Sequence, residues 1–62
     1  MIKEYYVIVD EEDREVNFYD AILIPNALNR AIQSAKQVDG GIVLHRKTDQ
    51  KSGEKRDNIV WP

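Results

Sequence analysis

The chain has 62 residues, of which 42% are hydrophobic and 32% charged, and its formal net charge is −2. That length allows a single domain, 1–62, with a core so small that oligomerisation or a bound partner is expected to help stabilise it. The absence of cysteine excludes disulfides and thiolate zinc sites, and one histidine is too few for a histidine-rich metal site.

Neither a membrane segment nor a cofactor motif is evident. No apolar run approaches the roughly 20 residues that a membrane-spanning helix needs. The first residues, Met1–Glu4, lack the hydrophobic stretch of a signal peptide. Together with the lack of cysteine, this predicts a cytoplasmic protein that does not bind membranes. No phosphate-binding glycine loop is present, so no cofactor is expected.

The first part of the chain predicts two strands joined by a polar turn at 10–13. Ile2–Val9 is rich in β-branched and aromatic residues and is apolar on both faces, which indicates a central strand. Arg14–Tyr19 alternates as a half-buried strand does, with Val16 and Phe18 on its apolar side. Residues 20–24 are compatible with either a continued strand or a buried connection.

Pro25–Val38 predicts an amphipathic helix that begins near the proline and ends at Asp39-Gly40-Gly41. At about 100° per residue, six apolar side chains fall within an arc of about 140°. They are Ala27, Leu28, Ala31, Ile32, Ala35 and Val38. Because three of them are alanines, the helix is expected to lie close against a sheet. The glycines are expected to form its cap, since glycine adopts the left-handed conformation without strain.

Two further strands are predicted in the remaining third of the chain, Ile42–Lys47 and Arg56–Trp61, with a hairpin loop at 49–54. The resulting order of strands and helix predicts the α+β class. The expected architecture is a small two-layer ββαββ fold, in which a four-stranded, mainly antiparallel sheet carries one helix on one face.

Charge is distributed unevenly along the chain. Residues 1–30 hold three basic and seven acidic side chains, whereas residues 41–62 hold five basic and three acidic. In the predicted topology the turn 10–13 shares an end of the molecule with the helix C-terminus, and the second hairpin loop shares the other end with the helix N-terminus. The helix dipole has the same sign as the nearby side chains at each end, so the molecule is expected to be electrically polar.

One helix can cover only one face of the sheet, so the other face is a candidate interface for a protein partner or a homodimer. From the alternation, we expect that face to present several aromatic side chains, which are enriched in the centres of interfaces. The candidate interface residues are Tyr6, Ile8, Tyr19, Val43, His45 and Trp61.

The acidic residues around the first turn form a candidate acidic patch. They are Asp10, Glu11, Glu12, Asp13 and Glu15. They lack the alternate spacing and the glycine of a calcium-binding loop, so no metal site is expected. Three interpretations remain: a solvated turn, a docking patch for a basic protein, or a short mimic of DNA phosphates.

The basic residues of the second hairpin form a candidate nucleic-acid site. They are Arg46, Lys47, Lys51, Lys55 and Arg56. Such cations can contact phosphates, although three nearby acidic residues dilute their charge. The alternative is a charged hairpin that discourages edge-to-edge aggregation.

His45 is the one histidine, and Ser52 and Asp49 lie near enough in the sequence to suggest a catalytic triad. No oxyanion-hole glycine motif accompanies these three residues, and no other nucleophile–base pair is evident. The sequence therefore predicts that the protein is not an enzyme and that His45 is a surface or interface histidine.

An alanine-rich helix between strands, followed by the segment Asp39–Arg46 (DGGIVLHR), resembles many short α+β proteins of bacteriophages and mobile elements over about residues 20–46. The resemblance implies an inhibitor or regulator that binds a host protein, such as defence or transcription machinery. The leading hypothesis is therefore a non-enzymatic protein-binding module. The alternative is a small nucleic-acid-binding protein that uses the hairpin 45–56.

Overall fold

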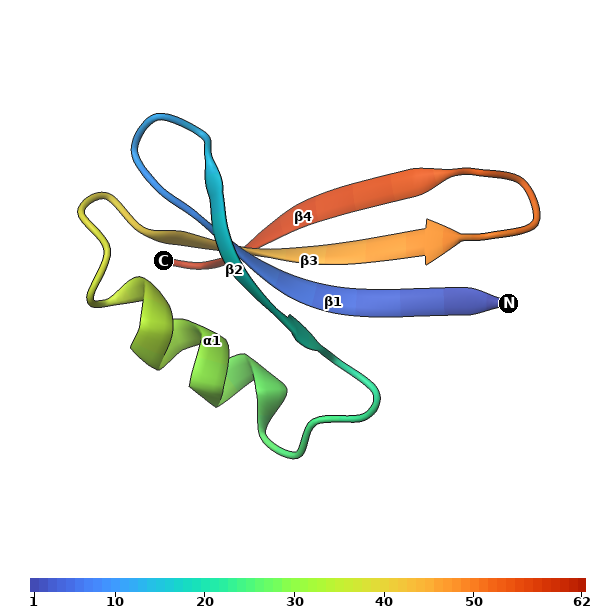
Figure 1. The fold of residues 1–62 in the computed structure, drawn as a ribbon, viewed down its shortest axis with the longest axis horizontal. Coiled ribbons are helices and arrows are strands. Elements are labelled where there is room, and N and C mark those ends of the chain that lie inside the picture. The colour runs from blue at the N-terminus through green and yellow to red at the C-terminus, as the bar shows by residue number, and fades with distance from the viewer.

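A computed structural model describes all 62 residues as a four-stranded sheet with one helix (Figure 1). The strands are β1 (Ile2–Val9), β2 (Glu15–Asp20), β3 (Ile42–Asp49) and β4 (Lys55–Trp61), and the helix is α1 (Ala27–Ala35). All neighbouring strands pair antiparallel in the order β2-β1-β3-β4. The predicted α+β fold and the interior position of β1 are thereby confirmed.

Three aspartates organise the connections between these elements. The carboxylates of Asp10, Asp20 and Asp49 each accept hydrogen bonds of 2.9 Å from backbone N–H groups two to four residues further along. These bonds hold the pKa values of all three carboxyl groups below their usual range. Aspartate suits such turns because its short side chain can take the place of a backbone partner. Residues 20–24, which the sequence left open, form a turn of this kind.

The helix is shorter than the sequence predicted. Asn26 has a left-handed backbone conformation (φ 56°) and separates Pro25 from α1, so the predicted start at the proline is wrong. After Ala35 the chain continues in tight turns, in which the N–H of Val38 donates to the carbonyl of Ala35 at 3.0 Å. Gly40 then has the expected left-handed conformation, with φ 66°. Helix α1 is not long and apolar enough to cross a membrane.

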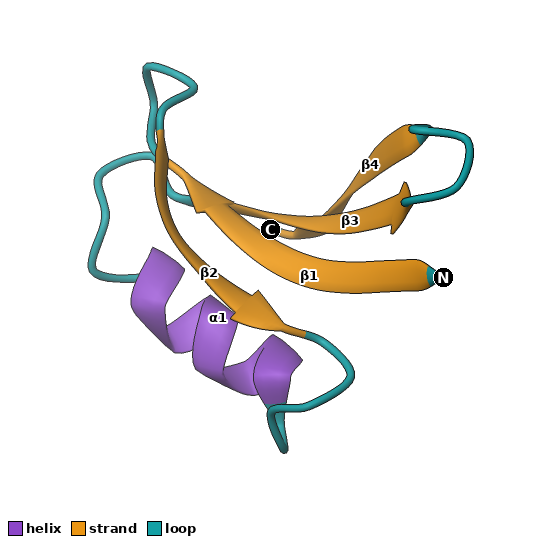
Figure 2. Ribbon diagram, turned by 45° about the vertical axis from the view of Figure 1, so that its right-hand side comes forward, coloured by secondary structure: helices purple, strands orange, loops and turns teal.

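Helix α1 packs on one face of the sheet, chiefly against β1, β2 and β3 (Figure 2). Its alanine stripe is buried, as predicted, with Ala31 fully inaccessible to solvent. Ile8 of β1 and Val43 of β3 are also fully buried and form one cluster with Ala31 and Ala35. The small alanines let the helix backbone approach the two branched side chains closely, which gives the thin core its packing density.

The predicted choice of face was wrong. Ile8 and Val43 were expected on the uncovered face but lie beneath α1, and Tyr6, Tyr19 and Trp61 pack against the same cluster. Ile8 and Val43 therefore belong to the core of the fold, and Tyr6, Tyr19 and Trp61 are half-buried against it on the side of the helix. The error arises because β1 is apolar on both faces, so its alternation separates two faces without showing which one the helix covers.

The uncovered face, called here the open face, carries the opposite alternation. Its central residues, from the register of the strands, are Tyr5, Val7, Glu15, Phe18, Leu44, Arg46, Thr48, Lys55, Asp57 and Ile59. Val16 and Phe18, expected on the buried side of β2, are 48% and 64% exposed.

Candidate functional site

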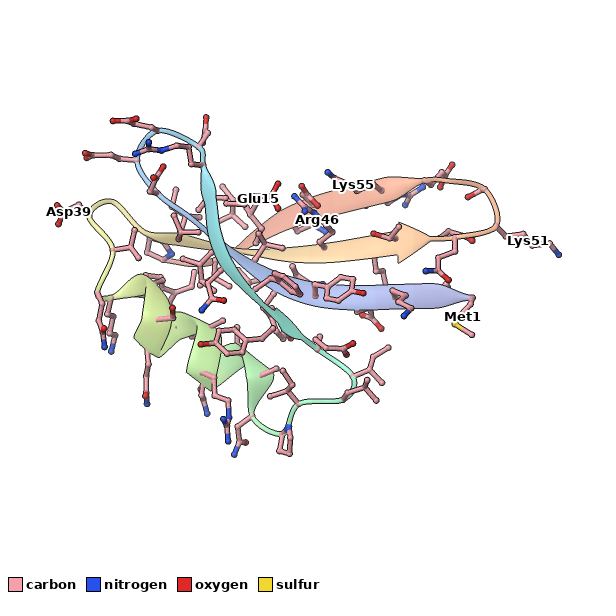
Figure 3. The ribbon with its side chains drawn as sticks, viewed as in Figure 1. Met1, Glu15, Asp39, Arg46, Lys51 and Lys55 are labelled. Atoms are coloured by element: carbon pink, nitrogen blue, oxygen red, sulfur yellow. The ribbon has the colours of Figure 1, made fainter.

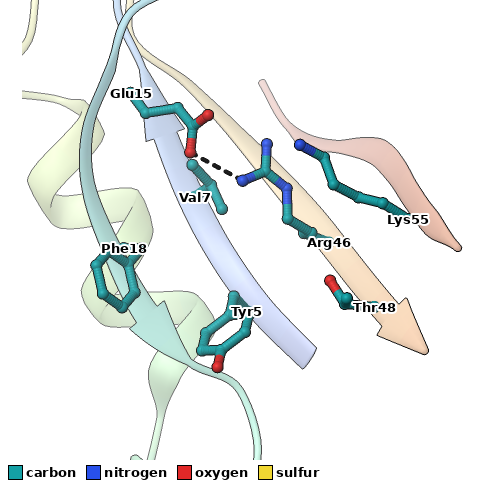
Figure 4. Close-up of a pocket in the computed structure, with 7 residues that line it drawn as sticks. All are labelled: Tyr5, Val7, Glu15, Phe18, Arg46, Thr48 and Lys55. Carbon is teal, nitrogen blue, oxygen red and sulfur yellow. Dashed lines mark hydrogen bonds and ion pairs between the residues drawn. The ribbon is translucent and has the colours of Figure 1, made fainter. Parts of the chain in front are cut away.

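The open face contains a shallow hollow of about 380 Å³ to which all four strands contribute (Figure 4). It is lined by Tyr5, Val7, Glu15, Phe18, Arg46, Thr48 and Lys55. The rings of Tyr5 and Phe18 meet edge to face, with their centroids 5.8 Å apart, and the basic side chains of Arg46 and Lys55 lie across the hollow from them. The hollow thus has an aromatic side and a charged side.

Arg46 bridges two carboxylates from the two edge strands. It donates to both carboxylate oxygens of Asp57, at 2.9 and 3.1 Å, and to one oxygen of Glu15 at 2.8 Å. The bond to Glu15 crosses β1, because β1 lies between β2 and β3 in the sheet. Val7 of β1 is only 2% exposed although no helix covers it. The charged side chains of this bridge therefore shield part of the open face from water.

The bridge fixes the charge state of its members. The hydrogen bonds from Arg46 hold the pKa values of Glu15 and Asp57 below their usual range. The same bonds, that with Asp57 foremost, raise the pKa of Arg46. All three groups are consequently ionised at neutral pH, and each is already engaged with another.

We expect Arg46→Met to lower stability at pH 7 by about 1 kcal/mol, because partly exposed ion pairs each contribute a fraction of that amount. The bridge stabilises the fold above pH 3.8–4.5, the usual pKa range of its carboxyls. That stabilisation is lost as the pH falls through their lowered folded-state pKa values. Urea denaturation should therefore show a smaller difference between variant and wild type at pH 3 than at pH 7.

Arg56→Met is the matched control for that measurement. Arg56 is 79% exposed and lies 3.9 Å from its nearest carboxylate, on Glu54, so its removal should change stability little at either pH. Equal losses from the two arginine variants would contradict a specific role for the bridge.

The basic hairpin does not form one continuous surface. Arg46 is engaged by two carboxylates, and Lys55 lies on the open face beside it (Figure 3). Lys47 and Arg56 are cross-strand partners on the opposite face, and Lys51 is at the hairpin turn. This division reduces the number of cations that one nucleic-acid backbone could neutralise, and binding to nucleic acid scales with that number.

The acidic turn lies at the opposite end of the molecule from Lys51 (Figure 3). A Cβ on Gly40 would come within 2.7 Å of the Glu11 Cβ, so the turn packs against the connection that follows α1. Asp10 and Glu12 both pair with Arg14, at 3.0 and 3.3 Å. The predicted grouping at the C-terminal end of the helix is confirmed for residues 10–13. Glu15 was wrongly included in the patch, because its partner is on the open face.

His45 has a different partner from the ones the sequence suggested. Its Nε2 lies 3.0 Å from a carboxylate oxygen of Glu4, and its ring packs against Tyr6 with the centroids 5.2 Å apart. No hydrogen bond joins it to Ser52 or Asp49, whose side chains serve the local turn. The structure also contains no group of three or more acidic or histidine side chains that could hold a metal ion.

Sequence reasoning missed the exposed apolar residues of the open face. Phe18 on β2 and Ile59 on β4 are each 64% exposed and stand on opposite edge strands. The available signal was charge: Glu15, Arg46 and Asp57 have complementary charges, and burying such a group beneath a helix would cost free energy of desolvation.

Comparisons with protein-family models, curated proteins and solved structures found no match to this chain. The site is therefore interpreted from its geometry and chemistry alone.

Proposed function

We propose that this chain is a non-enzymatic protein-binding module whose contact surface is the open face. The observation that carries the proposal is the exposure of Phe18, which lines the hollow, and of Ile59 on the other edge strand, each 64%. Apolar side chains gathered on an uncovered face mark an interaction site more often than they mark a solvated surface. Glu15, Arg46 and Asp57 are paired with one another there, so the aromatic and aliphatic side chains supply most of the binding energy.

The open face is also rigid enough to bind without a large ordering cost. Its residues stand on four hydrogen-bonded strands, and the bridge from Arg46 links three of them. Tyr5 and Phe18 restrain each other through their edge-to-face contact. Groups that are already held in place lose little conformational entropy on binding, and this favours affinity.

Catalysis fits the chemistry of this hollow less well than binding does. A general acid or base works best when its pKa lies near the working pH, which for a carboxyl group requires a raised pKa. The pKa values of the Glu15 and Asp57 carboxyls are shifted in the opposite direction.

The proposal of a protein-binding module extends to an inhibitor or regulator that acts in the cytoplasm by occupying a surface of its partner, as the resemblance to small phage proteins implies.

Phe18→Asp should weaken partner binding by about 100-fold or more, because it puts an unpaired charge into the contact surface in place of an exposed aromatic ring. Capture from an extract of the native cell, followed by direct titration of the captured protein, would measure the loss. Phe18 is exposed, so the variant should keep the wild-type circular dichroism spectrum.

Leu23→Asp is the control for that experiment, because Leu23 is 78% exposed but lies in the turn after β2 and does not line the hollow. It should capture the same protein with unchanged affinity. A partner that binds Phe18→Asp as well as it binds the wild type would overturn the proposed function, as would the capture of no specific protein.

A further inference from the structure

We propose that the occupant of the open face is a second copy of this chain, placed so that the acidic end of each copy meets the basic end of the other. The inference rests on the proposed function, since it takes the open face to be a protein-contact surface. A twofold axis in the plane of such an interface relates the copies, and a twofold interface must be complementary to itself.

The charges within the open face meet that requirement. Glu15, Arg46 and Lys55 line the hollow, and Asp57 pairs with Arg46 beside it. The two carboxylates are thus balanced by two basic side chains. A face with no net charge has no electrostatic preference for a strongly acidic or strongly basic partner. It can approach an identical face without bringing an excess of like charge together.

The two ends of the molecule then select one orientation. Glu11, Glu12 and Asp13 belong to the turn between β1 and β2. That turn lies at the opposite end of the molecule from Lys51 (Figure 3). Two copies that face each other with their ends exchanged bring each acidic turn toward a basic hairpin. Copies with their ends aligned would bring like charges together, so complementarity favours the exchanged arrangement.

The accessible surface of the whole chain leaves room for a partner, and the area of the open face sets the strength of the contact. A 7.2 kDa monomer is expected to expose about 4,100 Å², whereas this chain exposes 4510 Å² and buries only seven residues. Four strands at spacings of about 4.8 Å, each roughly 20 Å long, give the open face a projected area of about 400 Å². That area places the dimer among small interfaces, which bury under about 1,200 Å² in total and dissociate readily.

The test is sedimentation of the full chain from about 1 to 500 μM, the range in which a dimer with a micromolar dissociation constant dissociates. Two charge-reversed variants are compared with the wild type: Glu11→Lys/Glu12→Lys and Lys51→Glu. None of these three residues lines the hollow. In a dimer of either variant both end contacts become repulsive, so each should dimerise about tenfold or more weakly.

An equimolar mixture of the two variants should recover the wild-type affinity. In the mixed dimer the reversed turn faces the reversed hairpin and the two unchanged ends face each other, so both contacts are attractive again. Phe18→Asp should be monomeric throughout. A mixture that fails to recover would overturn the exchanged arrangement, and a dimer unaffected by Phe18→Asp would show that another surface is used.

A wild type that stays monomeric over the whole range would overturn the second-copy inference by itself. The proposed function would then be judged separately, by whether Phe18→Asp loses capture of a different protein. Loss of that capture would uphold the proposed function without the dimer, and retention of that capture would overturn both the proposed function and the dimer.

Discussion

Ile8→Ala should destabilise the fold by about 2–5 kcal/mol, as truncation of a fully buried isoleucine generally does. Ile8 is 0% exposed and packs with Ala31, Ala35 and Val43 under the helix. A domain of this length has a total stability of roughly 3–9 kcal/mol, so the variant should be largely or partly unfolded at room temperature. Urea denaturation followed by the fluorescence of Trp61 measures the effect. Ile8→Val, expected to cost about 1 kcal/mol, keeps it measurable if the alanine variant does not fold.

Ile59→Ala is the matched control, because Ile59 is the same residue type on the open face and is 64% exposed. Measured below the micromolar concentrations at which a dimer would form, it should change stability by less than about 0.5 kcal/mol. A larger loss from Ile59 than from Ile8 would contradict the burial of Ile8 beneath the helix.

The strands and the helix could be predicted because their signals are local. A run of β-branched and aromatic residues identifies β1 with its observed bounds, and the spacing of Ala27, Ala31 and Ala35 identifies the buried side of α1. The end-to-end placement of the acidic turn and the second hairpin loop also followed, because chain direction in an antiparallel fold decides which end a turn occupies. None of these conclusions depends on which sheet face the helix covers.

The covered face could not be predicted because it depends on long-range packing. Tyr5 and Val7 on one side of β1 are as apolar as Tyr6 and Ile8 on the other, so this strand carries no preference. On β2 the pattern favoured burial of Phe18, yet the structure exposes it and packs the adjacent Tyr19 against the core. The two possible choices of covered face are distinguished only by the cross-strand register. It places charged residues of three strands on the same side of the sheet as Phe18.

That register explains how the open face combines apolar exposure with charge. The bridge from Arg46 shields Val7 and leaves Phe18 and Ile59 uncovered on the two edge strands. Full burial of all three side chains would require a second layer, which one nine-residue helix on the other face cannot supply. The single helix thus covers one face of the sheet, and apolar area on the other face remains exposed.

Ala31→Leu should destabilise the fold by about 1–3 kcal/mol, because it adds three carbon atoms where the helix touches the sheet. Ala31 is 0% exposed, and its neighbours Ile8 and Val43 are equally inaccessible, so the larger side chain has no free volume to enter. Either α1 must move away from the sheet or β1 and β3 must shift, and both responses reduce contact in an already small core.

The measurement is again urea denaturation, with Gln33→Leu as the control. Gln33 lies on the exposed side of α1, and leucine and glutamine have similar helix propensities, so this variant should stay within about 0.5 kcal/mol of the wild type. If Ala31→Leu were as stable as Gln33→Leu, the helix would have to tolerate a wider separation from the sheet. The alanine stripe would then reflect helix propensity alone and not close packing, because a helix packed closely against Ile8 and Val43 has no room for leucine.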